Sequence, residues 1–245
     1  MNRRGFFTTL PDPVTIPSRC VVSLGSAPWP PRLGEIITVG DDRGRHYRGR
    51  VERISGHWCE VHLFDRLARP MDSSLDLLLL QALPDKERME WIIQKSTELG
   101  VTGIVPFYSQ RSIRLEEREA RQPKAHRWPR VARRASQQCR RPGVPVIAPY
   151  TDFSSALRHA EGFDLKLVLW EGEHEIGLKG ICPGGERPSR ISVLVGPEGG
   201  LTDEEVGLAR ESGFVSIGLG PRILRTETAA IGIVAVIQFL WGDLG

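Results

Sequence analysis

Apolar residues occur in short alternating stretches over the first 70 positions of the chain. In residues 58–64 every second residue is apolar (Cys59, Val61 and Leu63), the period of a strand with one buried face. Two further strands are expected at residues 35–39 and 45–54, because turn-like sequences containing Gly separate these stretches from their neighbours. Several short strands joined by turns are typical of a small β-barrel.

Beyond a linker at residues 69–74 the pattern changes to continuous apolar runs. Residues 75–83 form such a run, typical of a parallel strand buried on both faces. Residues 86–99 have helical spacing of apolar positions, and Gly100 stands where a helix cap is expected. The alternation predicts an α/β domain around a mostly parallel sheet over residues 71–245, after a β-module over residues 1–70. Further buried strands are expected at residues 101–107, 165–169, 191–195 and 214–219.

The composition is that of a globular protein, with 40% hydrophobic and 26% charged residues. The longest apolar stretch, residues 229–240, is too short to cross a bilayer. Residues 1–10 lack the apolar core of a signal peptide, so we expect a cytoplasmic protein with no membrane partner. The four cysteines are far apart in sequence and form no CxxC pair, which predicts free thiols and no metal site.

Positive charge is concentrated in one segment. The net charge is only +3, but residues 111–141 contain eleven Lys or Arg and three Glu, a local charge of +8. The chain has 28 Arg and 5 Lys, and the planar guanidinium is suited to phosphates and stacked bases. A GC-rich genome would explain the Arg excess but explains the clustering less well. We therefore predict a nucleic-acid-binding face, with a helix within residues 122–138 that brings Arg127, Arg130 and Arg134 to one side.

Loops at the carboxyl ends of parallel strands commonly form binding sites, and three such ends are unusual here. The first has Glu171 directly after a predicted strand, although a Glu there is more often a helix cap or a solvated residue. The second, at residues 196–200, has three glycines that allow close backbone approach, followed by a Thr202–Glu205 capping box. An ordinary tight turn is the alternative. The chain has no GxGxxG and no GxxxxGK[ST] motif, which disfavours dinucleotide and nucleoside-triphosphate binding by those routes.

The third strand end, at residues 218–230, combines two glycines and a proline with Arg222, Arg225 and Glu227. A helix is predicted to begin near Thr226, and guanidinium groups beside a helix N-terminus would hold a carboxylate or a phosphate. The alternative is a surface Arg225–Glu227 pair. The helix is apolar nearly all round, which predicts burial on all sides, within the domain or in a homodimer interface.

Three segments resemble those of the 16S ribosomal RNA uracil-N3 methyltransferases of the RsmE type. They are LVGPEGG with LTDEE, GLGPRILRTETAA, and the stretch from Arg88 to Val101, in the family's order from about residue 75 to the end. Arg4-Gly5-Phe6 is similar to the family's opening Arg-x-aromatic. Two departures are Gln137, where the family usually has Glu, and residues 27–34, which replace a His followed by Val-Leu-Arg.

This resemblance implies a SPOUT-type knotted parallel-sheet methyltransferase domain preceded by a small PUA-like β-barrel domain. It also implies that S-adenosyl-L-methionine is bound by the three strand ends. The cofactor-binding residues would be Leu169, Trp170, Glu171, Val195, Gly196, Pro197, Glu198, Gly199, Gly200, Leu219, Gly220, Ile223, Leu224, Arg225, Thr226 and Ala229.

The implied reaction places its main chemical demand on the acceptor, because uracil N3 carries a proton that must be lost. Arg222 and Arg225 are candidates to orient the anion or a phosphate, and Glu198 or Glu227 to act as the base. The partner would be 16S rRNA or the small ribosomal subunit. Two alternatives remain: a SPOUT enzyme with another RNA target or a ribose 2′-oxygen acceptor, and a catalytically silent RNA-binding ribosome-assembly protein. The RNA-binding candidates are Arg4, Arg111, Arg127, Arg130, Arg134 and Arg141.

Overall fold

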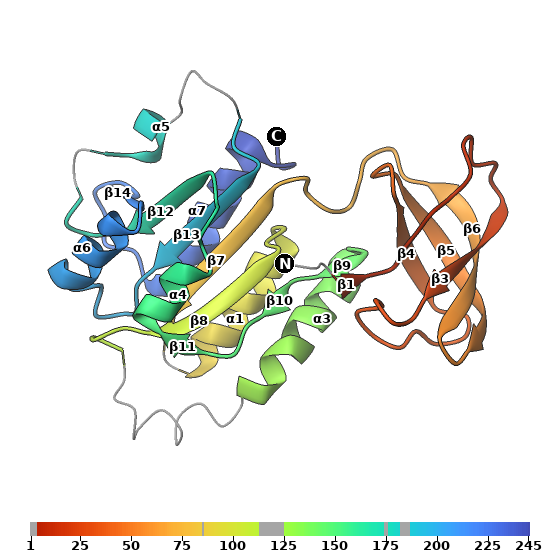
Figure 1. Ribbon diagram of the computed structural model, residues 1–245, viewed down its shortest axis with the longest axis horizontal. Helices are drawn as coiled ribbons and strands as arrows, with labels where there is room; N and C mark the ends of the chain where they lie inside the picture. Colours follow the sequence, from red (N-terminus) through yellow and green to blue (C-terminus); the bar gives the residue numbers. More distant parts are fainter. Residues whose placement is uncertain (1–3, 85, 113–124, 174–175, 182–186) are drawn as a thin grey trace. The chain divides into compact units, whose positions relative to one another are not determined.

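The computed structural model describes residues 4–84, 86–112, 125–173, 176–181 and 187–245. The chain divides into two compact units (Figure 1). The barrel unit consists of Met1–Ser73 and Arg133–Pro145, and the α/β unit of Ser74–Ala132 and Val146–Gly245. The barrel unit thus includes a second piece of chain that the sequence pattern assigned to the α/β domain.

The barrel unit contains a five-stranded sheet that curls until its two outer strands meet. Neighbouring strands are antiparallel except for the parallel β2–β4 pair. The Thr8 hydroxyl on β2 donates to the Val21 carbonyl on β3 at 2.7 Å, so the barrel is nearly closed. Cys59, Val61 and Leu63 are buried, which confirms the alternation read from the sequence. In sheet order the strands are β2 (Phe7–Thr8), β4 (Ile36–Asp41), β5 (His46–Ser55), β6 (Trp58–Arg66) and β3 (Ser18–Ser23).

The second chain piece of the barrel unit is joined to the first by backbone pairing. Strand β1 (Arg4–Gly5) pairs antiparallel with β9 (Gly143–Val144), and the Phe6 N–H donates to the Pro142 carbonyl at 3.1 Å. The Thr38 hydroxyl donates to the Arg140 carbonyl at 2.8 Å. The piece therefore completes the barrel unit.

The α/β unit is built on a seven-stranded sheet in which every pairing is parallel. The order is β10-β8-β7-β13-β12-β14, with β11 also paired to β8. Parallel strands need crossover connections, which matches the predicted alternation of strands and helices. The strands are β7 (Asp76–Ala82), β8 (Gly103–Tyr108), β10 (Val146–Ile147), β11 (Thr151–Asp152), β12 (Leu165–Leu169), β13 (Arg190–Val195) and β14 (Val215–Ile217).

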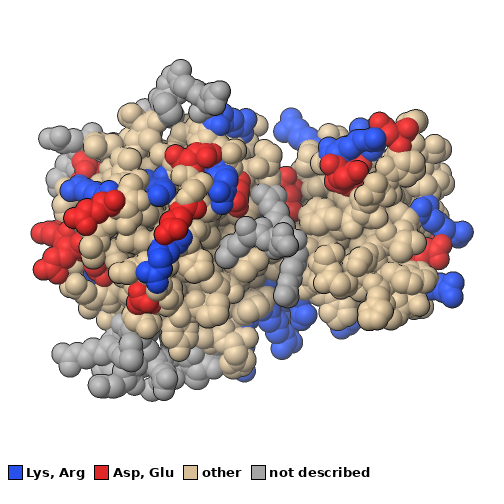
Figure 2. Space-filling model, viewed as in Figure 1, with Lys and Arg blue, Asp and Glu red and all other residues tan. Residues whose placement is uncertain are grey.

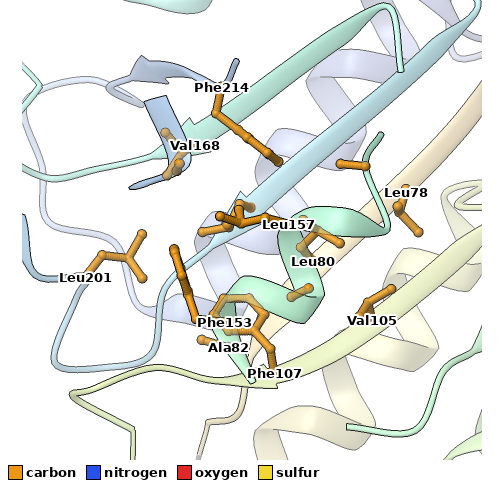
Figure 3. Close-up of a cluster of buried hydrophobic side chains, with 14 of the residues drawn as sticks. Leu78, Leu80, Ala82, Val105, Phe107, Phe153, Leu157, Val168, Leu201 and Phe214 are labelled. Carbon is orange, nitrogen blue, oxygen red and sulfur yellow. The ribbon is translucent and has the colours of Figure 1, made fainter. Parts of the chain in front are cut away.

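Helices cover both faces of this sheet, which is why its central strands are mostly apolar. Helices α1 (Lys86–Glu98) and α7 (Thr226–Trp241) pack together on one face, and α4 (Phe153–Arg158) and α6 (Asp203–Glu211) lie on the other (Figure 1). On the α4–α6 face, alternate residues of the strands interdigitate with both helices (Figure 3). The other helical segments are η1 (Ala125–Arg127), α3 (Trp128–Cys139) and α5 (Leu178–Ile181).

Two predicted helix ends are confirmed. Gly100 ends α1 with φ +92°, and the Val101 and Gly100 N–H groups donate to the Ser96 and Thr97 carbonyls, a Schellman cap. At the start of α6 the Thr202 side chain and Glu205 form the expected capping box.

Helix α7 is not buried on all sides within the chain, so the first of the two predicted alternatives, complete burial within the domain, is wrong. Val236, Phe239 and Leu240 are 41%, 64% and 36% exposed, whereas Ile233 and Ile237 are fully buried. A helix that covers one face of a sheet buries only the side turned to the sheet and to neighbouring helices. Among the helices of the described residues, none is long and apolar enough to span a bilayer.

Candidate functional site

The three unusual strand ends meet around one cavity of about 420 Å³ in the α/β unit. Of the predicted cofactor-binding residues, all but Gly199 and Arg225 line it. Of the predicted catalytic residues, Arg222 and Glu198 line it, whereas Arg225 and Glu227 do not. The lining is Leu169, Trp170, Glu171, Glu173, Val195, Gly196, Pro197, Glu198, Gly200, Leu201, Ile217, Gly218, Leu219, Gly220, Pro221, Arg222, Ile223, Leu224, Thr226 and Ala229.

The loop after β12 is held by α6. The Arg210 guanidinium lies 5.3 Å from the centroid of the Trp170 ring and 3.5 Å from a Glu173 carboxylate oxygen. A Cβ atom at Gly218 would lie only 2.5 Å from the Glu173 carbonyl oxygen, so only glycine fits there. Glu173 was not predicted from the sequence, and Gly218 was included in the third strand end without a binding role.

Residues 196–201 form the glycine loop, which follows β13. The Gly200 N–H donates to the Pro197 carbonyl at 3.0 Å and closes a tight turn. Gly200 has φ +70°, and a Cβ atom there would lie 3.0 Å from a Glu171 carboxylate oxygen. The loop therefore needs glycine for both its backbone conformation and its close contact with the loop after β12.

A buried chain of hydrogen bonds joins the glycine loop to the sheet and to α7. The Thr226 hydroxyl donates to the Gly196 carbonyl at 2.7 Å and accepts from the Gln81 amide at 3.0 Å. The same amide donates to the Ala82 carbonyl at 2.9 Å. Thr226 is 4% exposed and Gln81 is fully buried. Gln81 had no predicted role, although its amide interrupts the carboxyl end of the apolar run 75–83.

One guanidinium links the two carboxylates that were candidate bases. Arg88 Nη1 lies 2.9 Å from Glu198 Oε1 and 3.9 Å from Glu227 Oε2. The Glu198 side chain is 36% exposed and lines the cavity, whereas the Glu227 side chain is 15% exposed and does not line it. Glu198 is therefore the better placed of the two to meet a ligand. Arg88 begins one of the three segments that resemble the methyltransferase family, but no role could be assigned to it from the sequence.

The loop between β14 and α7 is open to solvent. Arg222 and Arg225 are exposed, and Ile223 between them is 88% exposed. Arg225 is the N-cap residue of α7 with an extended backbone, and its side chain makes no capping hydrogen bond. Both guanidinium groups are thus accessible near the cavity and the N-terminus of a long helix, where anions bind favourably.

The arginines predicted on one side of a helix are exposed as expected. Arg127 ends η1 and Arg130 and Arg134 lie on α3, while Trp128 and Ala132 are buried. Figure 2 shows Lys and Arg without neighbouring Asp or Glu below the middle of the view, where Figure 1 places α3. The rest of the basic segment, residues 113–124, lies outside the described residues, as does the side chain of Arg4.

Two arginines depart from the predicted RNA-binding set. Arg141 is buried, and its Nε lies 2.5 Å from Asp72 Oδ1, so its guanidinium serves an internal ion pair and is not available to RNA. The backbone explains this burial: Arg140 follows α3 with φ +66°, and the chain then turns toward β9, which pairs with β1. Arg111 is exposed but lies against the glycine loop, with its Nη1 donating to the Gly199 carbonyl at 3.0 Å.

The described cysteines Cys20, Cys59 and Cys139 are free thiols, while Cys182 lies outside the described residues. Burial raises the pKa of the Cys20 thiol to about 12, so that it stays protonated at neutral pH. Within the part of the chain that the structure describes, no group of three or more His, Cys, Asp or Glu residues is arranged to hold a metal ion.

Comparison with known proteins gives a consistent set of relatives. Residues 71–238 match the family model of the RNA methyltransferase domain. The chain is 35% identical to the ribosomal RNA small subunit methyltransferase E of Bacillus subtilis over 67% of this chain and 66% of that protein. It is 34% identical to the protein of the same name from Aquifex aeolicus, over 84% of this chain and 96% of that protein.

Two solved structures have the same overall chain fold. The crystal structure of a ribosomal RNA small subunit methyltransferase E from Neisseria gonorrhoeae bound to S-adenosyl methionine has a TM-score of 0.69 and 31% identity, covering 98% of this chain and 100% of that one. A methyltransferase of Legionella pneumophila, in complex with the same cofactor, has a TM-score of 0.68 and 29% identity, with complete coverage of both chains.

Proposed function

Since the chain belongs to the RNA methyltransferase family that includes the ribosomal RNA small subunit methyltransferases E, we propose that it methylates N3 of a uridine in 16S rRNA with S-adenosyl-L-methionine. The observation that carries this proposal is the cavity formed by three loops at the carboxyl ends of β12, β13 and β14. Its volume of about 420 Å³ is in the range of cofactor sites.

The residues around the cavity fit this cofactor. Leu169, Leu219 and Leu224 offer apolar side chains to an adenine ring, and the glycines offer close backbone approach. The charged lining comprises three carboxylates and one guanidinium, which favours a cationic sulfonium ligand over a polyphosphate. When bound, S-adenosylmethionine supplies an activated methyl group and leaves as a neutral thioether.

The residues of the chain act mainly on the acceptor base. Glu198 lines the cavity and is oriented by Arg88, so we assign it to accept the N3 proton. Arg222 lines the same cavity and stabilises the negative charge that develops on the uracil. Arg225, exposed at the start of α7, holds an RNA phosphate or the same anion. Glu227 acts indirectly, because it helps to hold the Arg88 guanidinium that orients Glu198.

RNA docking is assigned to the exposed arginines of η1 and α3. Arg127, Arg130 and Arg134 provide positive charge without Asp or Glu in the sequence between them. Phosphate contacts of this kind supply affinity that falls as salt rises, whereas the cavity selects the base. The target uridine has to leave its stack before its N3 can enter the cavity.

We also propose the finer architecture that the family resemblance implies. The three loops would be threaded as the trefoil knot of a SPOUT domain, and the barrel unit would be the PUA-like domain. The exposed apolar side of α7, with Val236, Phe239 and Leu240, supports a homodimer interface, because water-exposed apolar faces of this kind mark contact surfaces. An rRNA substrate is consistent with a cytoplasmic site of action.

Isothermal titration of the purified protein with S-adenosylmethionine, followed by mass mapping of 16S rRNA from a gene-deletion strain, tests the proposal. We expect micromolar binding and the loss of one methyl group from one uridine base. Loss of a ribose methyl group instead would assign a 2′-oxygen acceptor. RNA binding without cofactor binding would assign a catalytically silent ribosome-assembly protein.

A further inference from the structure

Arg111 is the one member of the predicted RNA-binding set whose guanidinium contacts the glycine loop among the described residues. It follows β8, and its Nη1 donates to the Gly199 carbonyl at 3.0 Å and to the Leu201 carbonyl at 3.4 Å. These two carbonyls lie on either side of Gly200, whose positive φ sets the direction of the loop. One nitrogen of the guanidinium, Nη1, thus bonds to main-chain carbonyls on both sides of Gly200.

The contact between the two segments is close and extends beyond Arg111. A Cβ atom at Gly199 would lie 3.2 Å from the Cβ atom of Arg111, so the loop leaves no room for a larger residue without a shift. The preceding residue, Gln110, donates its N–H to Glu205 Oε1 at 2.8 Å. Glu205 is 2% exposed and forms the capping box that ends the loop. Gln110 and Arg111 therefore support both the loop and the start of α6.

These hydrogen bonds lower the free-energy cost of binding a ligand at the glycine loop. A loop with three glycines samples many backbone conformations, and ordering it on ligand binding costs free energy. Hydrogen bonds that hold the turn before the ligand arrives remove part of that cost. Gly196, Glu198, Gly200 and Leu201 line the cavity, while the Arg111 side chain reaches the loop through main-chain carbonyls.

We propose that Arg111 is a positioning residue for the cofactor, whose guanidinium holds the glycine loop in the conformation that binds S-adenosylmethionine. The inference rests on the proposed function and deepens it, because it names a residue outside the three loops that sets cofactor affinity. It also separates Arg111 from Arg130 and Arg134, whose guanidinium groups are exposed on α3. A phosphate-binding role would need only a positive charge, whereas this role needs the two N–H groups of Nη1 to be held in the guanidinium plane and directed at two carbonyls.

The test compares Arg111→Ala and Arg111→Lys with the wild type by isothermal titration with S-adenosylmethionine. Loss of both hydrogen bonds from a partly solvated guanidinium is expected to raise the Kd for the cofactor about five- to tenfold. Lysine keeps the charge, but its ammonium ends a shorter, flexible chain and its N–H groups are not held in a plane, so Arg111→Lys is expected to recover less than half of that loss. Arg158→Ala removes an exposed arginine of α4 from the same unit and serves as the matched control, with an unchanged Kd.

Steady-state kinetics and the affinity for 16S rRNA are then measured for the same variants and for Arg130→Ala. With small ribosomal subunits from the deletion strain as substrate, Arg111→Ala is expected to raise the KM for S-adenosylmethionine while kcat at saturating cofactor stays near the wild-type value. Its affinity for 16S rRNA without cofactor should equal that of the wild type, and Arg130→Ala should show the opposite pattern. If Arg111→Ala folds poorly, Gly199→Ala keeps the guanidinium and disturbs the same contact, and is expected to weaken cofactor binding about two- to threefold.

An unchanged cofactor Kd in Arg111→Ala, or full rescue by Arg111→Lys, would overturn the positioning role. Reduced RNA affinity with normal cofactor binding would return Arg111 to the RNA-binding set. Failure of the wild type to bind S-adenosylmethionine would refute the proposed function itself, so the two failures are distinguishable.

Discussion

Replacement of Thr226 by valine tests the buried hydrogen bonds beneath the glycine loop. Valine has the shape of threonine, so the change removes the hydroxyl and leaves the packing intact. In the wild type this hydroxyl donates to the Gly196 carbonyl at 2.7 Å and accepts from the Gln81 amide at 3.0 Å. In the variant the carbonyl loses this donor, while the amide keeps its bond to the Ala82 carbonyl at 2.9 Å.

The size of the effect follows from the burial of these groups. A buried polar group left without a partner costs about 1–3 kcal/mol. In this variant the Gly196 carbonyl loses its hydrogen bond from Thr226, and the Gln81 amide loses one of its two hydrogen bonds. We therefore expect the free energy of unfolding of the α/β unit to fall by about 2 kcal/mol. Because the Gly196 carbonyl belongs to the glycine loop, the Kd for S-adenosylmethionine is expected to rise about tenfold, equivalent to 1.4 kcal/mol.

Urea denaturation, followed by tryptophan fluorescence and circular dichroism, measures the first effect. With an m-value of about 2–3 kcal/mol/M for a unit of this size, the midpoint should move down by about 0.7–1 M. The transition of the barrel unit should not move, since Thr226 lies in the α/β unit. Thr226→Ser keeps the hydroxyl and should lose only about 1 kcal/mol for one buried methyl group. Equal midpoints and equal cofactor affinities for Thr226→Val and the wild type would refute the reasoning.

Three further predictions concern the reaction, the RNA face and pH. Arg225→Ala should abolish methyl transfer while the protein still folds and binds S-adenosylmethionine, and normal turnover would exclude the assigned role. Charge reversal at Arg130 and Arg134 should weaken rRNA binding and flatten its dependence on salt without changing cofactor affinity, as measured by filter binding at several salt concentrations. Burial lowers the pKa of His46, whose Nδ1 accepts from the Met71 N–H at 2.7 Å, so stability should fall as pH decreases below about 6.5, where the unfolded state takes up a proton and the folded state does not. His46→Asn keeps an acceptor for that N–H and should give a flatter unfolding profile between about pH 5 and 7, and an unchanged profile would assign the effect to other groups.

Much of the fold could be predicted from local pattern. Five of the seven strands of the α/β unit (β7, β8, β12, β13 and β14) were predicted to within a few residues, because helices cover both faces of the sheet and leave mostly apolar strands such as β7. The two-residue strands β10 and β11 were not predicted. The sites of the three loops could be located as well, since glycine and proline cluster where strands end and the backbone must approach closely. The cavity lining shows that these segments come together in space.

Other features had no local signature. The burial of Arg141 depends on Asp72, 69 positions away in the sequence, and on a left-handed residue, Arg140, at a position where glycine is the usual signal. Arg111 reaches main-chain carbonyls, which every residue possesses, so no residue pattern marks its partner. Arg88 meets Glu198 only because α1 begins beside the glycine loop. Charge counts identified a basic segment but could not separate arginines that bind protein from those that face solvent.

The composition of the barrel unit from two pieces of chain has a consequence for biosynthesis. Residues up to Ser73 leave the ribosome first, but β9 and the arginine partner of Asp72 lie within Arg133–Pro145. At a translation rate of about 5–20 residues per second, those partners are synthesised roughly four to fourteen seconds after the amino-terminal strands. During that interval β1 is unpaired and the Asp72 carboxylate has no guanidinium. The barrel unit therefore reaches its final structure only after Pro145 has been translated, and its completion requires residues 74–132 of the α/β unit to be synthesised first.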